Sequence, residues 1–345
     1  MVSGHSRHGR GPAPTDSLAG YPYIQSDSPS PVNDSQPSVT AVPAPLPSMF
    51  SAFKSPVLLA TDGTDEAVGA VALGAALATA RAAVLRMLTV LEPSAYPFPG
   101  AEPLGASIAS VNVQAAVEAR LRETVTSQIG AYLGDAAARE VHFTRGRVVP
   151  TIVAESRVAG AGLILLGLHP HGILERLAGE ETALRVARTA GLPVLCVTPS
   201  LMKLPRRIIA AVDFSPASVR AAREVLTFAP DGATIVLAHV RPPATDRNAA
   251  NARANYTSGV GDALTRLQLS LPTAKNVTVT TVTLEGQPVP ELLNYALQTG
   301  ADLIALGAHR HSFVGRLVLG SVATDILRAA TVSVFVVPPA GRAET

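Results

Sequence analysis

The stretch that decides the fold is Leu306-Gly-Ala-His-Arg-His-Ser-Phe-Val-Gly-Arg-Leu-Val-Leu-Gly-Ser321. It follows an apolar run typical of a strand, and it ends where a helix is predicted to begin. A loop in this position directs backbone N–H groups and the positive end of a helix dipole toward an anion. We therefore interpret the stretch as a loop that faces phosphate.

A second copy of this stretch lies earlier in the chain. Gly167 and Gly307 are 307 − 167 = 140 positions apart, and the same offset aligns His169 with His309, His171 with His311 and Arg176 with Arg316. Near the starts of the copies, Asp62 and Asp213 end matching apolar runs at an offset of 213 − 62 = 151. The chain is therefore an internal duplication, and each unit has the size of a single domain.

We assign residues 54–200 to repeat 1 and residues 205–340 to repeat 2. Residues 1–50 differ from both, because they hold nine of the 28 prolines and few aliphatic residues. Such a segment buries too little apolar surface to offset the entropy of ordering. We predict a disordered Pro/Ser-rich tail.

Composition excludes several classes of function. The chain is 47% hydrophobic with a net charge of +2, which favours two buried cores and gives no global bias toward nucleic acid or membrane. Aromatic residues make up 4% and Trp is absent, so platforms for stacking bases are not expected. The single cysteine, Cys196, is predicted to be a buried small hydrophobe. With no apolar leader segment recognised, a cytoplasmic location is the default expectation.

Short β-rich runs alternate with helical patterns in each repeat, which predicts an α/β fold. In repeat 2 we predict strands at 206–212, 232–240, 276–284, 301–307 and 332–337, and helices at 215–229, 246–271, 287–299 and 320–330. In repeat 1 the equivalent strands fall at 56–61, 83–90, 139–145, 162–168 and 192–198. The first helix of each repeat is predicted to start the same way, at a cap formed by Thr64 or Ser215. Each repeat is expected to form a doubly wound, Rossmann-like (flavodoxin-like) parallel sheet with strand order 3-2-1-4-5.

This strand order predicts where a ligand binds. The crevice of a doubly wound sheet lies at the carboxyl ends of the strands where the order reverses, here between strands 1 and 4. Asp213 follows strand 1 and Gly307 follows strand 4. A carboxylate can accept hydrogen bonds from a base amine or a ribose hydroxyl, while helix amides receive phosphate. Ser215 suits the helix cap better than Asp213, which favours a binding role for Asp213.

The two repeats resemble tandem domains of the universal stress protein family. ATP-binding members of that family carry G-x2-G-x9-G-[S/T] after the fourth strand. In repeat 2, Gly307 and Gly320-Ser321 stand at the spacing of the family, and Arg310 replaces the second glycine. In repeat 1, Glu180-Glu181 occupy the Gly-Ser positions. Two carboxylates there would repel a triphosphate, so repeat 1 is predicted not to bind ATP.

The resemblance also implies site residues for an ATP in repeat 2. Asp213 is implied as the contact to adenine or ribose, and Val240 as the residue that flanks the base. The residues implied around the phosphates are Gly307, His309, Arg310, Gly320, Ser321 and Val322. Family domains pair through their last strands, which implies that 193–198 and 332–337 lie together as an intramolecular pseudo-dimer. A further homodimer is left open.

Other chemistry finds little support in the sequence. The pairs His169/His171 and His309/His311 supply only two of the three or four ligands that zinc takes, and His239 is a candidate third. No Walker A sequence, Gly-x-Ser-x-Gly elbow or His-Glu-x-x-His pattern occurs. The leading hypothesis is a stress-response protein that binds an adenine nucleotide in repeat 2 and signals to protein partners. The alternatives are a nucleotide-free structural or partner-binding protein and, more weakly, an ATP-hydrolysing enzyme.

Overall fold

The computed structural model describes residues 55–92, 108–168, 182–243, 250–272, 276–308 and 319–339, all within the compact unit Leu46–Thr345. The predicted tail at 1–50 lies outside the described residues, as do most of the loop after strand 4 of repeat 1 and its counterpart in repeat 2. Among the described residues, no helix is long and apolar enough to cross a membrane.

Repeat 1 alternates strands and helices in the predicted order. Its strands are β1 (Val57–Ala60), β2 (Leu85–Leu91), β3 (His142–Arg145), β4 (Leu163–Gly167) and β5 (Val194–Val197). Its helices are η1 (Asp65–Ala67), α1 (Val68–Arg81), α2 (Ile108–Leu133), α3 (Asp135–Arg139), α4 (Val148–Val158) and α5 (Thr182–Thr189).

Repeat 2 follows the same plan. Its strands are β6 (Arg207–Ala211), β7 (Thr234–Arg241), β8 (Thr278–Glu285), β9 (Leu303–Gly307) and β10 (Ser333–Val337). Its helices are α6 (Pro216–Glu224), η4 (Val225–Thr227), α7 (Ala250–Ser270), α8 (Pro288–Thr299) and α9 (Ser321–Ala329). The second helical region is longer in repeat 1, where the 26-residue α2 is followed by α3, than in repeat 2, where α7 has 21 residues.

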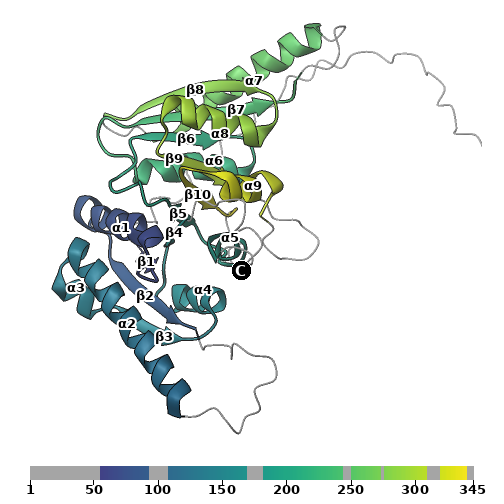
Figure 1. The fold of residues 1–345 in the computed structure, drawn as a ribbon. Helices are drawn as coiled ribbons and strands as arrows, with labels where there is room; N and C mark the ends of the chain where they lie inside the picture. The colour runs from purple at the N-terminus through teal and green to yellow at the C-terminus, as the bar shows by residue number, and fades with distance from the viewer. Residues whose placement is uncertain are drawn as a thin grey trace, which may run out of the picture. The chain divides into compact units, whose positions relative to one another are not determined.

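The ten strands within the described residues form one sheet in the order β3-β2-β1-β4-β5-β10-β9-β6-β7-β8 (Figure 1). Each repeat therefore has the predicted order 3-2-1-4-5, with parallel neighbours throughout. The last strands, β5 and β10, pair antiparallel with Leu195 opposite Phe335. The Thr198 amide adds a hydrogen bond of 3.1 Å to the Ser333 hydroxyl. The expected intramolecular pseudo-dimer is confirmed.

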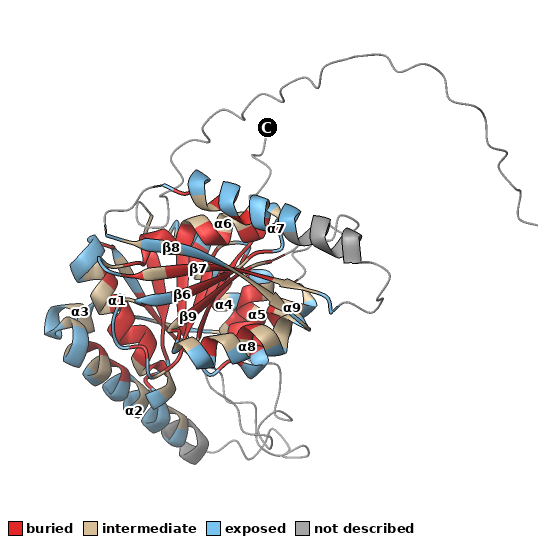
Figure 2. Ribbon diagram, turned by 90° about the horizontal axis from the view of Figure 1, so that it is seen from above, coloured by how far each residue is buried: buried red, intermediate tan, exposed pale blue. Residues whose placement is uncertain are grey.

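Helices cover both faces of the sheet and enclose two hydrophobic clusters. One cluster packs against α1, α2, α6 and α7, and the other packs against α4, α5, α8 and α9. Every residue of β1, β5 and β10 is buried. Figure 2 shows the buried residues in red through the middle of the sheet. Strands buried on both faces need uninterrupted apolar sequence. This is why these central strands could be predicted, and Cys196 in β5 is buried as expected.

The first helices of the two repeats do not start in the same way, so that prediction is wrong. Ser215 caps α6, because its hydroxyl oxygen accepts a hydrogen bond of 3.2 Å from the Ser218 amide. Thr64 occupies the cap position of η1 but makes no cap hydrogen bond with its side chain. Its hydroxyl instead donates to the Asp62 carboxylate at 2.7 Å. The Thr64 hydroxyl therefore orders the turn after β1 rather than the start of the helix.

Candidate functional site

A cavity of about 230 Å³ opens at the carboxyl ends of β6 and β9, where the strand order of repeat 2 reverses. Six of the eight residues predicted for the site line it together: Asp213, Val240, Gly307, Gly320, Ser321 and Val322. The other two, His309 and Arg310, lie outside the described residues. Sequence regions more than a hundred positions apart thus meet at one crevice, as the topology predicted.

The loop after β6 is held by a short hydrogen-bond network. Asp213 Oδ1 accepts a hydrogen bond of 2.9 Å from the Ser215 amide, and the Asp213 amide donates to the Ser218 hydroxyl at 3.3 Å. The Ser218 hydroxyl in turn donates to the Ser215 carbonyl at 3.1 Å. Asp213 stays exposed at the cavity although it anchors this turn. The network fixes where its carboxylate lies, and Ser215 rather than Asp213 caps the helix.

Gly307 is required by packing as well as by its place in the loop. A Cβ atom at this position would collide with main-chain atoms of Ala217 and Ser218, because the end of β9 lies against the start of α6. A glycine lets two backbones approach this closely. The residue therefore brings the capped start of α6 to the edge of the cavity, a role that the sequence interpretation did not include.

The start of α9 forms the opposite wall. Gly320 occupies the N-cap position with φ −58° and ψ 158°, a conformation that does not require glycine, and no side chain caps the helix. The first amides of a helix have no acceptor within the helix. Ser321 and Val322 carry such amides and line the cavity. This wall can bind an anion or a strong hydrogen-bond acceptor.

Sequence reasoning missed an aromatic pair beside the carboxylate. His239 is buried, its Nδ1 lies 2.7 Å from the Val212 carbonyl oxygen, and its ring centroid lies 5.0 Å from that of Phe214. Phe214 has a left-handed φ of 63°, which is unfavourable for a bulky residue. Its counterpart at the offset of 151 is Gly63, with φ 75°. An alignment of the two repeats that extends one residue beyond the aspartates would have paired Phe214 with Gly63 and pointed to a left-handed backbone there.

The histidines do not form a metal centre within the described chain. No group of three or more His, Cys, Asp or Glu residues there is arranged to hold a metal ion. His239, the candidate third ligand, directs Nδ1 to a carbonyl oxygen of its own repeat. The other candidates, His169, His171, His309 and His311, fall outside the described residues.

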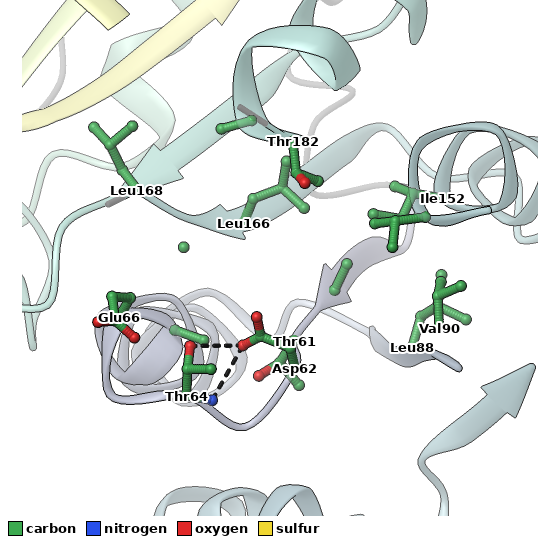
Figure 3. Close-up of a pocket in the computed structure, with 15 residues that line it drawn as sticks. Thr61, Asp62, Thr64, Glu66, Leu88, Val90, Ile152, Leu166, Leu168 and Thr182 are labelled. Carbon is green, nitrogen blue, oxygen red and sulfur yellow. Dashed lines mark hydrogen bonds between the residues drawn. The ribbon is translucent and has the colours of Figure 1, made fainter. Parts of the chain in front are cut away.

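Repeat 1 has a larger cavity, of about 450 Å³, at the equivalent crevice (Figure 3). Asp62 and Glu66 lie on one side of it and Thr182 on the other, while Leu88, Val90 and Ile152 supply an apolar wall. Asp62 Oδ1 accepts hydrogen bonds from both the amide and the hydroxyl of Thr64, at 3.1 and 2.7 Å. The aspartate is thus anchored in both repeats.

The two cavities differ in charge. Glu66 of repeat 1 corresponds to Ala217 of repeat 2 at the offset 217 − 66 = 151. Repeat 1 therefore has two carboxylates among the described lining residues, whereas repeat 2 has only Asp213. Each carboxylate adds repulsive Coulomb energy when a negatively charged ligand enters the cavity. The electrostatics of the described residues favour an anion in repeat 2 over repeat 1.

Among the comparisons with known proteins, a family model identifies a family and solved structures show a similar fold. The model of the universal stress protein family matches residues 55–198 and again 205–338. A universal stress protein from Archaeoglobus fulgidus has a similar structure, with a TM-score of 0.55 and 18% identity over 82% of this chain and 96% of that one. A functionally unknown protein from Pseudomonas aeruginosa PAO1 gives a TM-score of 0.53 and 18% identity over 84% and 94%. No curated protein sequence matches the chain.

Proposed function

Because the chain belongs to the universal stress protein family, we propose that it is a stress-response protein whose second repeat binds an adenine nucleotide, ATP in the first instance, as a sensor. The observation that carries this proposal is one crevice with a carboxylate on one side and an uncapped helix start on the other. Asp213 supplies the carboxylate, and Gly320 begins the helix.

The chemistry of the two walls matches two parts of a nucleotide. The Asp213 carboxylate can accept hydrogen bonds from the adenine amine or the ribose hydroxyls, and Val240 gives the base an apolar neighbour. The amides of Ser321 and Val322 can receive phosphate oxygens, which the α9 dipole further stabilises. His309 and Arg310 belong to this proposal through the family motif alone.

The size of the cavity limits what the described residues can hold. About 230 Å³ lies below the 300–1,000 Å³ that is usual for small-molecule sites, so the described residues enclose only part of a nucleotide. Binding rather than turnover is the proposed activity, and occupancy is proposed to alter contacts with protein partners in the cytoplasm.

Titration calorimetry of the full chain with ATP tests the proposal. We expect one site per chain, and Asp213→Asn should weaken binding by about ten- to a hundredfold, because a charged hydrogen bond is worth about 1.5–3 kcal/mol. The matched control is Asp62→Asn, which changes the equivalent carboxylate of repeat 1 and should leave ATP binding unaltered. Absence of any ATP binding would refute the proposal and leave the nucleotide-free scaffold.

A second variant gives repeat 2 the residue that repeat 1 has at the equivalent position. Gly320→Glu places a carboxylate at the start of α9, where repeat 1 has Glu180. The negative charge opposes both the helix dipole and the phosphates, so ATP binding should fall by about tenfold or more. Gly320→Gln, which has nearly the same size without the charge, separates electrostatics from steric obstruction. Equal losses in the two variants would show that charge is not the cause.

A further inference from the structure

A groove between α4 and α5 of repeat 1 is separate from the crevice described above. It has a volume of about 480 Å³, and among the described residues it is lined only by these two helices. Its lining residues are Val149, Pro150, Val153, Ala154, Arg157, Arg185, Arg188 and Thr189. None of them lines the cavity of repeat 1 at the carboxyl ends of the strands.

The groove is strongly positive. Arg157 comes from α4, and Arg185 and Arg188 come from α5. Among the described residues, no hydrogen bond or ion pair engages the guanidinium groups of Arg157 or Arg185, whereas Arg188 has a further interaction in the fold. The two helices contain one acidic residue, Glu155, whose carboxylate lies 4.0 Å from the His142 ring instead.

The floor of the groove is apolar. Val149 and Val153 are 6% and 8% exposed, and they belong to the hydrophobic cluster beneath the helices. Pro150 and Ala154 are exposed on the same helix and extend this apolar surface. Guanidinium groups beside an apolar floor suit a ligand that has both carboxylates and aliphatic groups.

Repeat 2 lacks this arrangement. At the offset of 140, Arg157 corresponds to Leu297 and Arg185 corresponds to Asp325. Only Arg188 has a basic counterpart, Arg328. The fold of the repeat therefore does not require Arg157 and Arg185, and the positive groove is particular to repeat 1.

We propose that the α4–α5 groove of repeat 1 docks an acidic peptide segment of a partner protein. Carboxylates of the segment pair with Arg157 and Arg185, and an aliphatic side chain contacts Val149 and Val153. A nucleic acid fits the groove less well, because its described lining contains no aromatic residue on which bases could stack. The proposal goes beyond nucleotide sensing and does not depend on it.

Fluorescence anisotropy with the full chain and a labelled synthetic peptide of Glu and Leu residues tests this docking. We expect saturable binding that weakens by about tenfold or more when the peptide carries Gln in place of Glu, because charge-assisted hydrogen bonds are lost. The double variant Arg157→Leu/Arg185→Asp, which takes the residues of repeat 2, should lose binding by a similar factor or more. Arg157→Gln/Arg185→Gln provides a second variant without a reversed charge.

Matched controls use the duplication. Leu297→Arg/Asp325→Arg builds the same pair in repeat 2 and should add a second site for the acidic peptide. Asp213→Asn, which lies in the nucleotide crevice, should leave peptide binding unchanged. The proposal is overturned if the wild-type chain does not bind the Glu/Leu peptide, or if both arginine variants bind it as well as wild type does. It is also overturned if an oligothymidine strand binds equally tightly with the same dependence on Arg157 and Arg185.

Discussion

Repeat 1 and repeat 2 share one backbone plan, but they differ in the charge of two surfaces. At the crevice, repeat 1 has Glu66 where repeat 2 has Ala217. At the outer helices, repeat 1 has Arg157 where repeat 2 has Leu297. The buried strands and the glycines that end β4 and β9 are alike in the two repeats, because packing constrains them. Each repeat therefore offers its own surface chemistry on a common scaffold.

The junction between the repeats should be the part of the molecule that is most sensitive to substitution. Phe335 is fully buried and lies opposite Leu195 across the β5–β10 pair. Its ring packs edge-to-face against that of Phe228, with the two ring centroids 4.9 Å apart. Phe335→Ala should lower the free energy of unfolding by about 3–5 kcal/mol, because it removes this contact and leaves a cavity. Urea titration followed by circular dichroism measures this loss in the free energy of unfolding.

Two further substitutions at this junction test whether the two repeats contribute unequally to its stability. Phe335→Leu makes the two opposing residues identical, and it should cost clearly less than the alanine substitution because most of the volume is kept. Leu195→Ala is the counterpart in repeat 1. A loss below about 1 kcal/mol for Phe335→Ala would contradict a shared core that spans both repeats.

The glycines that end the fourth strands, β4 and β9, give the next largest difference in stability. Gly307→Ala should destabilise the chain by about 1–3 kcal/mol, because the new Cβ would collide with main-chain atoms of Ala217 and Ser218. In Gly167→Ala the nearest atoms, the Glu66 carbonyl oxygen and the Ala67 Cα, lie 2.9 and 3.0 Å from the new Cβ, so a smaller shift relieves the contact. Urea titration of both variants compares them. Equal losses would mean that the helix starts pack alike in the two repeats.

Much of this architecture could be predicted from the sequence, for an identifiable reason. Strands such as β5 and β10 are buried on both faces, so their sequences are continuous apolar runs. The strand order then brought Asp213 and Gly307 to one crevice, as the topology requires.

The missed features depend on tertiary context. Phe214 has a left-handed backbone conformation, and the Thr64 hydroxyl donates to Asp62 and makes no cap hydrogen bond in η1. The α4–α5 groove joins Arg157 and Arg185 from separate helices. No local pattern in the sequence signals that pairing. No local pattern in the sequence signals a carboxylate that is buried in the core either.

That carboxylate, Glu224, gives the smallest and most specific prediction. In repeat 1 its place is taken by Leu73, at the offset 224 − 73 = 151. Burial raises the pKa of Glu224 above its ordinary value, although Arg220 opposes the shift through an ion pair of 2.6 Å. Its Oε2 atom has no hydrogen-bond partner among the described residues. The ionised form is therefore disfavoured in the folded protein.

The sign of the pH dependence follows from this shift. As pH rises from 4.5, the ordinary pKa, toward the raised value, the unfolded chain loses the proton before the folded protein does. The free energy of unfolding should therefore fall with rising pH across this window. Glu224→Gln removes the titration, so urea titrations at a series of pH values should show wild type losing stability relative to the variant.

Glu118 of repeat 1 provides a control of opposite sign. The hydrogen bond from Arg145 lowers the pKa of Glu118, so its contribution to stability is present above the ordinary pKa and is lost as pH falls toward the lowered value. Relative to Glu118→Gln, wild type should therefore gain stability with rising pH. The effect should be weak, because the ion pair lies at the surface. If wild type gained stability over Glu224→Gln with rising pH as well, ionisation of Glu224 would favour folding, and the contrast between the two carboxylates would not hold.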